Sequence, residues 1–220
     1  MALDSASQNQ RRSDAPEVVV ARLPQYVRIL TRLLQEGAEV VSSQQLGEKL
    51  QVTPAQIRKD LSYFGRFGKQ GRGYSVIHLL ERLKLILGLN SFWNVAVVGV
   101  GRLGRAILSY PGFTPDGFHI VAAFDSNPDV VGETIAELTV SSLEELDEVV
   151  SSKKISIAIV AVPTEHTQGV VDRLVACGVR AVLNYAPISP QVREGVRVRN
   201  IDPVLSLQSM TYYLTDHPVD

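Results

Sequence analysis

Three glycines, Gly99, Gly101 and Gly104, stand at G-x-G-x-x-G spacing directly after a short apolar run at residues 95–98. The run is typical of a strand buried on both faces of a parallel sheet, and a helical pattern follows at once. At this spacing the first glycine permits a tight turn, the second lets the backbone approach a pyrophosphate, and the third lets the helix pack closely on the strand. The amides and dipole of the new helix attract phosphates. The sequence therefore predicts a dinucleotide-binding loop, lined by Gly99, Val100, Gly101, Arg102, Leu103 and Gly104.

An acid, Asp125, ends the next apolar run and stands where this kind of loop binds ribose, a little over the usual ~20 residues beyond the glycines. A carboxylate there accepts hydrogen bonds from a ribose 2′-hydroxyl and repels a 2′-phosphate, which favours NAD(H) over NADP(H). The alternative is that Asp125 caps the following turn, since residues 125–128 read Asp-Ser-Asn-Pro. We favour the ribose role because of the glycine loop upstream.

Strands and helices alternate beyond Asp125. The pattern predicts a Glu-rich amphipathic helix at residues 143–150, a buried strand at 155–162, a helix at 164–177 and a strand at 181–184. This alternation predicts an α/β Rossmann domain, a doubly wound parallel sheet whose ligand lies beyond the carboxyl ends of the strands.

Residues at these predicted strand ends are candidates for a nicotinamide site. They are Val162, Pro163, Asn184, Ala186 and Pro187. The alternative is structural, because proline and asparagine are common wherever a strand must stop.

A second constellation lies nearer the amino terminus, where a very short turn joins two expected helices. Residues 42–45 and 53–56 each match the capping-box pattern that starts a helix, and Pro54 occupies a first helical position. In the second helix, Ile57, Leu61 and Phe64 point to one side and small or basic side chains to the other. The pair predicts a helix-turn-helix whose second helix reads DNA. An ordinary helix with a solvated basic face is the alternative.

The glycine-punctuated loop at residues 65–74 favours the DNA-binding interpretation, because it carries Arg66, Lys69 and Arg72 and no acid. Such a loop suits a β-hairpin wing along the phosphate backbone or in a minor groove, although glycine loops can also be plain turns. Together the elements predict a winged helix. The residues expected at DNA are Ser43, Gln56, Arg58, Lys59, Ser62, Tyr63, Arg66, Lys69 and Arg72.

The charge of the chain is unevenly distributed. Residues 1–90 carry 13 Lys/Arg and 8 Asp/Glu, a net of +5, and residues 91–220 carry 9 and 15, a net of −6, which sum to the overall −1. A basic first part indicates a polyanionic partner for that part only. The single cysteine, Cys177, excludes an internal disulfide and a cysteine-based metal site, and we expect it to be a small buried residue. No run of residues suits a membrane span or a signal peptide, so we expect a cytoplasmic protein. We also expect no metal site.

Four segments follow from these patterns. We expect a disordered arm at residues 1–15, a winged-helix DNA-binding domain at 16–88, a Rossmann NAD(H)-binding domain at 89–201, and a carboxy-terminal helix with its tail at 202–220. The first domain begins with a helix whose expected inward residues include Leu23 and Leu34. The carboxy-terminal helix is apolar nearly all round, which predicts insertion into a partner subunit.

The chain resembles the Rex family of redox-sensing transcriptional repressors. The motifs that carry the resemblance are Ser-Ser-x-x-Leu-Gly at residues 42–47, Arg-Lys-Asp-Leu-Ser-Tyr-Phe-Gly at 58–65, Gly-x-Gly-Tyr at 71–74, Gly-x-Gly-Arg-Leu-Gly at 99–104, Tyr-Pro-Gly-Phe at 110–113 and Leu-Asn-Tyr-Ala-Pro at 183–187. They span nearly the whole chain after residue 16.

The resemblance implies a homodimer that binds a palindromic operator, exchanges its carboxy-terminal helices and leaves DNA when NADH replaces NAD⁺. It also implies that an arginine of the first helix pairs across subunits with an aspartate before the exchanged helix, here Arg28 and Asp202. Relatives often have an aromatic residue after that aspartate, in the nicotinamide region, where this chain has Pro203.

Two other classes compete with this interpretation. An NAD-dependent dehydrogenase needs a proton donor at the hydride site, but the chain has no Tyr-x-x-x-Lys pair. Its best candidate, His166, is expected on a helix surface, so we predict a sensor without catalytic residues. A coenzyme A-binding module could use the same glycine loop for its diphosphate, but it explains Asp125 less well.

Overall fold

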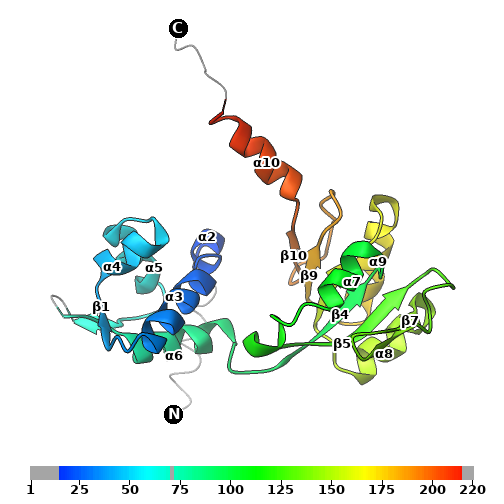
Figure 1. Cartoon of the computed structure of the whole chain (residues 1–220), viewed down its shortest axis with the longest axis horizontal. Helices are drawn as coiled ribbons and strands as arrows, with labels where there is room; N and C mark the ends of the chain where they lie inside the picture. The colour runs from blue at the N-terminus through cyan, green and yellow to red at the C-terminus, as the bar shows by residue number, and fades with distance from the viewer. Residues whose placement is uncertain (1–14, 70–71, 215–220) are drawn as a thin grey trace, which may run out of the picture. The chain divides into compact units, whose positions relative to one another are not determined.

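The computed structural model describes residues 15–69 and 72–214 of the chain (Figure 1). Its contacts divide the chain into two units, Met1–Ser91 and Phe92–Asp220. The division falls slightly after the boundary expected at residues 88/89, because the amides of Leu89 and Ser91 bond back to the carbonyls of Lys84 and Gly88. The expected arm at residues 1–15 lies outside the described residues, except for Ala15.

The first unit is a winged helix. Its helices are α2 (Glu17–Val20), α3 (Leu23–Gln35), α4 (Ser43–Leu50), α5 (Pro54–Ser62) and α6 (Val76–Leu87). Its strands β1 (Val40–Val41), β2 (Gly68–Lys69) and β3 (Gly73–Ser75) form an antiparallel sheet in the order β1-β3-β2. The β2–β3 hairpin is therefore the expected wing.

The turn between α4 and α5 is tight for local reasons. The side chains of Ser42 and Gln45 form the complete capping box at the start of α4. Gln51 ends α4 in the left-handed region at φ 56°. A Cβ on Gly47 would lie 2.5 Å from the carbonyl oxygen of Val52, so only glycine allows this close approach. These features bring the start of α5 directly against α4.

Two expectations about the first unit are corrected. Only half of the second capping box forms: Thr53 accepts from the Gln56 amide, but the Gln56 side chain bonds to Asp60 instead of reaching back. Leu34 is 40% exposed, because it lies at the edge of the apolar stripe of α3, whose buried residues are Leu23, Tyr26, Leu30 and Leu33.

The second unit is a doubly wound α/β domain. Its strands are β4 (Trp93–Val98), β5 (Phe118–Asp125), β6 (Thr134–Ile135), β7 (Leu138–Ser142), β8 (Ile157–Val160), β9 (Ala181–Asn184) and β10 (Arg197–Asn200). They form one sheet in the order β10-β9-β8-β4-β5-β7-β6, parallel except for the β6–β7 pair. The helices are α7 (Arg102–Leu108), α8 (Leu146–Ser152), α9 (Thr164–Ala176) and α10 (Pro203–Thr211).

The two faces of the sheet are covered by different helices (Figure 1). Ala96 and Val98 of β4 pack with residues of α8 and α9, whereas Val95 and Val97 pack with Ile107 and Leu108 of α7. This alternation is the period-two pattern of a strand buried on both faces.

The secondary structure differs from expectation at several points. The helix expected from residue 143 begins as a 3-10 turn, Leu143–Glu145, before α8. The strand expected at 155–162 is paired only over Ile157–Val160. The hairpin β6–β7 and the edge strand β10 were not anticipated, because their short, polar sequences lack an apolar run. Among the described residues, no helix is long and apolar enough to cross a membrane.

The last helix, α10, has no buried side chain. Its apolar residues, and those just after it, are exposed: Val204, Leu205, Leu207, Met210, Tyr212, Tyr213 and Leu214. This agrees with a helix that is apolar nearly all round and that the described residues of its own chain do not bury.

Candidate functional site

The glycine loop lies at the point where the strand order reverses. From β4 the chain proceeds to β5 and β7 on one side, then crosses to β8, β9 and β10 on the other. Because these strands are parallel, the carboxyl ends of β4, β5 and β8 meet at one edge of the sheet. Such a switch point is where doubly wound sheets bind their ligands.

Gly99 and Gly104 are required by the protein's own packing. Gly99 has φ +93°, and a Cβ there would lie 2.5 Å from the carbonyl oxygen of Ala161, directly after the neighbouring strand β8. A Cβ on Gly104 would collide with the carbonyl oxygen of Gly99, so this glycine lets α7 pack against the loop. Both agree with the first and third roles predicted from the spacing.

Gly101 differs, because no protein atom lies within 4 Å of the position that its Cβ would occupy. Gly101 is also exposed and stands at the N-cap of α7, ahead of exposed Arg102 and Leu103. The space at Gly101 fits a pyrophosphate that approaches the backbone, with Arg102 as a nearby cation. Val100 is buried, so it contributes its backbone rather than its side chain.

Asp125 ends β5 beside this loop and bonds in two directions. Its Oδ2 accepts from the Val100 amide at 2.6 Å, and its Oδ1 accepts from the Asn127 amide at 2.8 Å. The second bond is the turn-capping role considered as the alternative. The first ties the carboxylate to the glycine loop, where a ribose would lie next to the pyrophosphate.

The residues expected at the nicotinamide end have unequal surroundings. Val162 is half-buried and Pro163 is exposed at the start of α9. Ala186 is buried, and Pro187 is exposed on the loop after β9. All four lie at carboxyl ends of strands, as expected.

Asn184 has a structural role within that loop. Its side chain is fully buried, and its amide nitrogen donates to the carbonyls of Ala186 and Ile188 and to Oδ1 of Asn200. Its Oδ1 accepts from the Ala186 amide. The amide is therefore committed to the 184–188 loop, and Asn184 shapes the site rather than offering polar atoms to it.

In the first unit, α5 presents a basic outer face. Arg58, Lys59 and Ser62 are exposed, whereas Ile57 and Leu61 are buried. Arg58 Nη1 donates to the Ser43 hydroxyl at 3.1 Å, which brings two of the expected DNA contacts together. The Ser62 hydroxyl bonds back to the Lys59 carbonyl. Tyr63, half-buried, ends α5.

The wing adds further cations. Arg66 is exposed just before β2, and Arg72 is exposed in the connection between β2 and β3, directly before β3. Lys69 ends β2, but the placement of its side chain lies outside the described residues. Burial raises the pKa of Tyr74 in β3, and the charge of Arg58 opposes that shift, so α5 and the wing share one electrostatic environment.

Sequence reasoning assigned no role to Asp60, which appeared there only within the motif at residues 58–65. Asp60 has no exposed surface and bonds to Arg22, Tyr26 and Gln56. Gln56, expected to face DNA, is half-buried and directs its amide to Asp60 at 2.6 Å. The available signal was the position of Asp60 inside the apolar stripe of α5.

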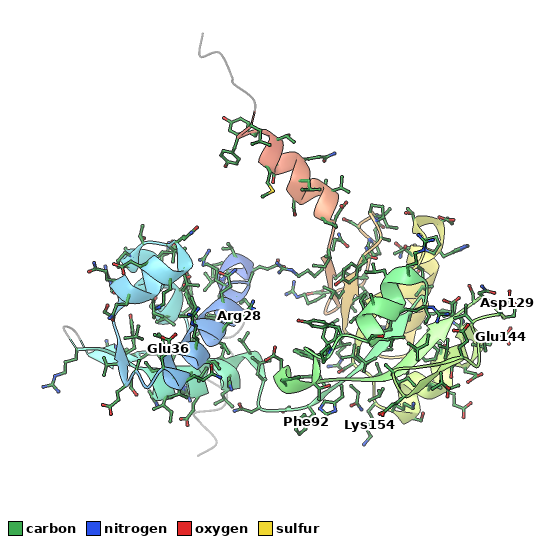
Figure 2. The ribbon with its side chains drawn as sticks, viewed as in Figure 1. Arg28, Glu36, Phe92, Asp129, Glu144 and Lys154 are labelled. Atoms are coloured by element: carbon green, nitrogen blue, oxygen red, sulfur yellow. The ribbon has the colours of Figure 1, made fainter. Side chains whose placement is uncertain are left out.

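Three other sequence candidates can be located. Arg28 is exposed on α3 (Figure 2). Asp202, in the other unit, caps α10 by accepting from the Val204 amide. His166 is exposed on α9, as expected.

Cys177 is half-buried rather than buried, because its Sγ bonds to Oδ1 of Asp147 at 3.1 Å near the surface. Desolvation and that carboxylate raise the pKa of its thiol to about 11, which makes it unreactive at neutral pH. Within the described ranges, no cluster of three or more His, Cys, Asp or Glu residues suits a metal ion.

Comparison with known families matches both units. Residues 14–62 match the family described as "Putative DNA-binding protein N-terminus", and residues 90–188 match the "CoA binding domain" family. A redox-sensing transcriptional repressor Rex from Roseiflexus sp. (strain RS-1) is 56% identical over 204 residues, which cover 93% of each chain. The chain belongs to the Rex family.

Other Rex-family proteins are similarly related. Rex from Chloroflexus aurantiacus is 55% identical over 92% of this chain and 96% of its own. Rex 1 from Thermotoga maritima is 44% identical over 90% of this chain and 94% of its own. These relatives are named as regulators, not enzymes.

Solved Rex-family structures share the fold of this chain. The repressor RSP in complex with beta-NAD⁺ and operator DNA has a TM-score of 0.86 and 39% identity, covering 90% of this chain and 92% of its own. RSP in complex with beta-NADH has a TM-score of 0.82 and 36% identity, covering 91% and 94%. The Rossmann and winged-helix assignments therefore agree with solved Rex-family structures over most of this chain.

Proposed function

We propose that this chain is a redox-sensing repressor that binds a palindromic operator as a homodimer and leaves it when NADH replaces NAD⁺. One observation carries the proposal: a relative that aligns over both units has been solved with NAD⁺ and operator DNA together. In this chain the open space at Gly101 is available for the cofactor, and the exposed basic side chains of α5, Arg58 and Lys59, are available for DNA.

The cofactor site can bind NAD(H) through three sets of groups. The amides at the start of α7 and the charge of Arg102 attract the pyrophosphate, and Gly101 leaves room for it. Asp125 accepts from the ribose hydroxyls and repels a 2′-phosphate. Val162, Pro163 and Pro187 stand where the nicotinamide ring would lie.

Redox sensing requires different affinities for the two cofactors in the two conformations of the dimer. NAD⁺ carries a positive ring and NADH a neutral, less planar one, so a poorly solvated pocket prefers NADH. Shifting the ratio of the two conformations from 1:99 to 99:1 requires a difference of about 10⁴-fold in affinity between them. The two cofactors of a dimer share this difference. This requires no bond to form or break, and we propose no enzymatic turnover.

The DNA site uses the outer face of α5 and the wing. Arg58 and Lys59 reach the major groove or its phosphates, while Arg66, Lys69 and Arg72 follow the backbone of the adjacent groove. A dimer of such units reads half-sites about 34–36 Å apart. Phosphate contacts make the affinity fall steeply with salt. Because operator DNA lies in the cytoplasm, the expected cytoplasmic location remains part of the proposal.

The dimer would bury α10 against a partner. On the α7 side of the sheet, Ile157, Leu183 and Tyr185 are only partly buried. An exchanged α10 would cover such a face, and its own apolar residues would lose water at about 25 cal/mol per Å². Arg28 and Asp202 would pair between subunits.

Coenzyme A is the second candidate ligand, because the second unit matches a family described by that name. Its diphosphate could use the same loop. Asp125 favours NAD(H), because the ribose of coenzyme A carries a phosphate that a carboxylate would repel.

The deciding experiment is a gel shift of the full chain on a palindromic operator, with NAD⁺, NADH, NADPH and coenzyme A titrated separately. Release by NADH alone is expected. Indifference to both NAD⁺ and NADH would overturn the proposal, and release by coenzyme A would favour the second candidate. Hydride transfer to a small substrate would favour a dehydrogenase.

A further inference from the structure

An acid is buried on the inner side of α5, behind the proposed DNA-reading face. Both oxygens of Asp60 accept two hydrogen bonds. Oδ2 accepts from Arg22 Nε at 2.7 Å and from the Tyr26 hydroxyl at 2.6 Å. Oδ1 accepts from Arg22 Nη2 at 2.8 Å and from Gln56 Nε2 at 2.6 Å. The carboxylate thus forms a bidentate pair with Arg22, and each of its two oxygens accepts two hydrogen bonds.

The hydrogen bonds from Arg22 and Tyr26 to Asp60 connect α3 with α5, although each of these helices packs mainly against a different helix. The backbone of α5 lies closest to α4, and that of α3 packs chiefly on α6. Arg22 is the N-cap residue of α3, and Tyr26 lies one turn further along. The apolar side chains of Ile57 and Leu61 also join the core, but apolar contacts are not directional. Hydrogen bonds weaken steeply as the donor–hydrogen–acceptor angle departs from linear, so the bonds to Asp60 fix the rotation of α5 about its axis.

The rotation of α5 decides which side chains face DNA. Successive residues in an α-helix are about 100° apart, so Asp60 and Arg58 point about 200° apart. Holding Asp60 against α3 therefore turns Arg58 outward. Gln56, one turn before Asp60, closes the cluster from the same helix.

We propose that Asp60 is a positioning residue that sets the rotation of α5 for operator reading, and that Arg22 and Tyr26 are the parts of α3 that hold it. This inference rests on the proposed operator binding. Base contacts depend on the angle at which a helix enters the groove, whereas contacts to the phosphate backbone carry no sequence information. Loosening the cluster should therefore reduce specific binding more than non-specific binding.

Tyr26→Phe is the cleanest test, because Tyr26 is 1% exposed and cannot itself touch DNA. The variant removes one bond and leaves the Arg22–Asp60 pair in place. We expect operator affinity to fall about five- to tenfold, with affinity for non-specific DNA within about twofold of wild type. Because a smaller folded fraction would lower both affinities equally, the ratio separates positioning from a purely structural role. Circular dichroism and NADH binding by the second unit report that the chain is folded.

Arg22→Lys tests whether Arg22 acts through geometry or as a direct phosphate contact. Lysine keeps the charge but cannot make the bidentate pair. Positioning predicts a loss of specificity like that of Tyr26→Phe, with an unchanged dependence on salt. Glu36→Gln, which removes the exposed Arg32–Glu36 pair of the same helix, is the matched control and should change nothing (Figure 2).

Wild-type behaviour for Tyr26→Phe, or an equal loss on operator and non-specific DNA, would overturn the positioning role. A wild-type chain that does not prefer the operator would overturn the proposed function and this inference together. A wild-type chain that prefers the operator, with variants that keep the preference, would overturn this inference alone.

Discussion

The Val100 amide donates to Oδ2 of Asp125 across 2.6 Å, so the acid at the end of β5 is joined to the glycine loop after β4. The bond gives the loop and the carboxylate a common position before any ribose is bound. The expected ribose ligand is thus also a structural support of the expected pyrophosphate site.

Replacing Asp125 should therefore affect both affinity and cofactor choice. Asp125→Asn keeps an oxygen that can accept from Val100 but loses the charge. Since charged hydrogen bonds contribute about 1.5–3 kcal/mol, we expect NADH affinity to fall at least about tenfold. NADPH should be rejected less strongly than by wild type.

Fluorescence titration with NADH and NADPH measures both effects. Asp129→Asn, which removes a charge from the exposed loop that follows, is the control and should keep the wild-type preference (Figure 2). An unchanged preference in Asp125→Asn would remove the ribose assignment.

The glycines of the loop should respond differently to alanine. Gly101→Ala places a methyl group in open space at φ −71°, so stability should change by less than about 0.5 kcal/mol while cofactor affinity falls at least about tenfold. Gly104→Ala drives a methyl group into the Gly99 carbonyl and should destabilise the second unit by about 1–3 kcal/mol or more.

Urea unfolding and calorimetric titration with NADH distinguish the two outcomes. If Gly101→Ala bound NADH as wild type does, the pyrophosphate would not pass over this residue.

Asp60 should make the first unit sensitive to acid. Burial would raise its pKa, but the hydrogen bonds from Arg22, Tyr26 and Gln56 outweigh it and hold the pKa below its ordinary value of 3.8. The stabilisation is therefore present above that value and is lost as pH falls through the lowered pKa. Tyr26→Phe weakens the lowering, so its stability should fall less steeply below about pH 4.

Helical circular dichroism during urea unfolding, repeated from pH 7 to pH 2.5, tests this difference. Equal slopes for wild type and Tyr26→Phe would show that the Tyr26 hydroxyl does not help to hold Asp60 ionised.

Charges placed on α10 should break the dimer without unfolding the chain. Leu207 and Met210 are about 60% exposed in the single chain and neither is buried, so changing either to aspartate leaves the core of the second unit intact. We expect dimers for wild type and monomers for Leu207→Asp and Met210→Asp, with weaker operator binding because only one half-site is held.

Light scattering after size-exclusion chromatography gives the mass. Ile77→Asp on α6, a comparable change at an exposed apolar residue, should leave the dimer intact. Monomeric wild-type protein would contradict the exchange of α10.

Arg28 and Asp202 should be coupled energetically although they lie in different units. We expect Arg28→Gln and Asp202→Asn each to shift the NADH concentration that releases operator DNA, and the double variant to shift it no further. Asparagine keeps the oxygen that caps α10, so only the charge is tested. Arg32→Gln on the same helix is the control, and additive effects would exclude the pair.

Much of this protein follows from local sequence, because the features involved are local in origin. Glycine spacing, capping residues and apolar periodicity act over a few residues, so the loop at 99–104, the strand at 181–184 and the turn between α4 and α5 could all be predicted. The first and third roles of the glycines in the loop agree with the packing around them.

Only the tertiary structure decided the partners of polar groups far apart in the chain. Nothing near Asp60 in sequence indicates that Arg22 neutralises it, that Tyr26 donates a hydrogen bond to it, or that Gln56 turns inward. Likewise, the bond from Val100 to Asp125 and the commitment of Asn184 to its own loop depend on which strands lie side by side. Hydrogen bonds require atoms within about 3 Å at suitable angles, and for distant residues only the packing of the elements sets those distances.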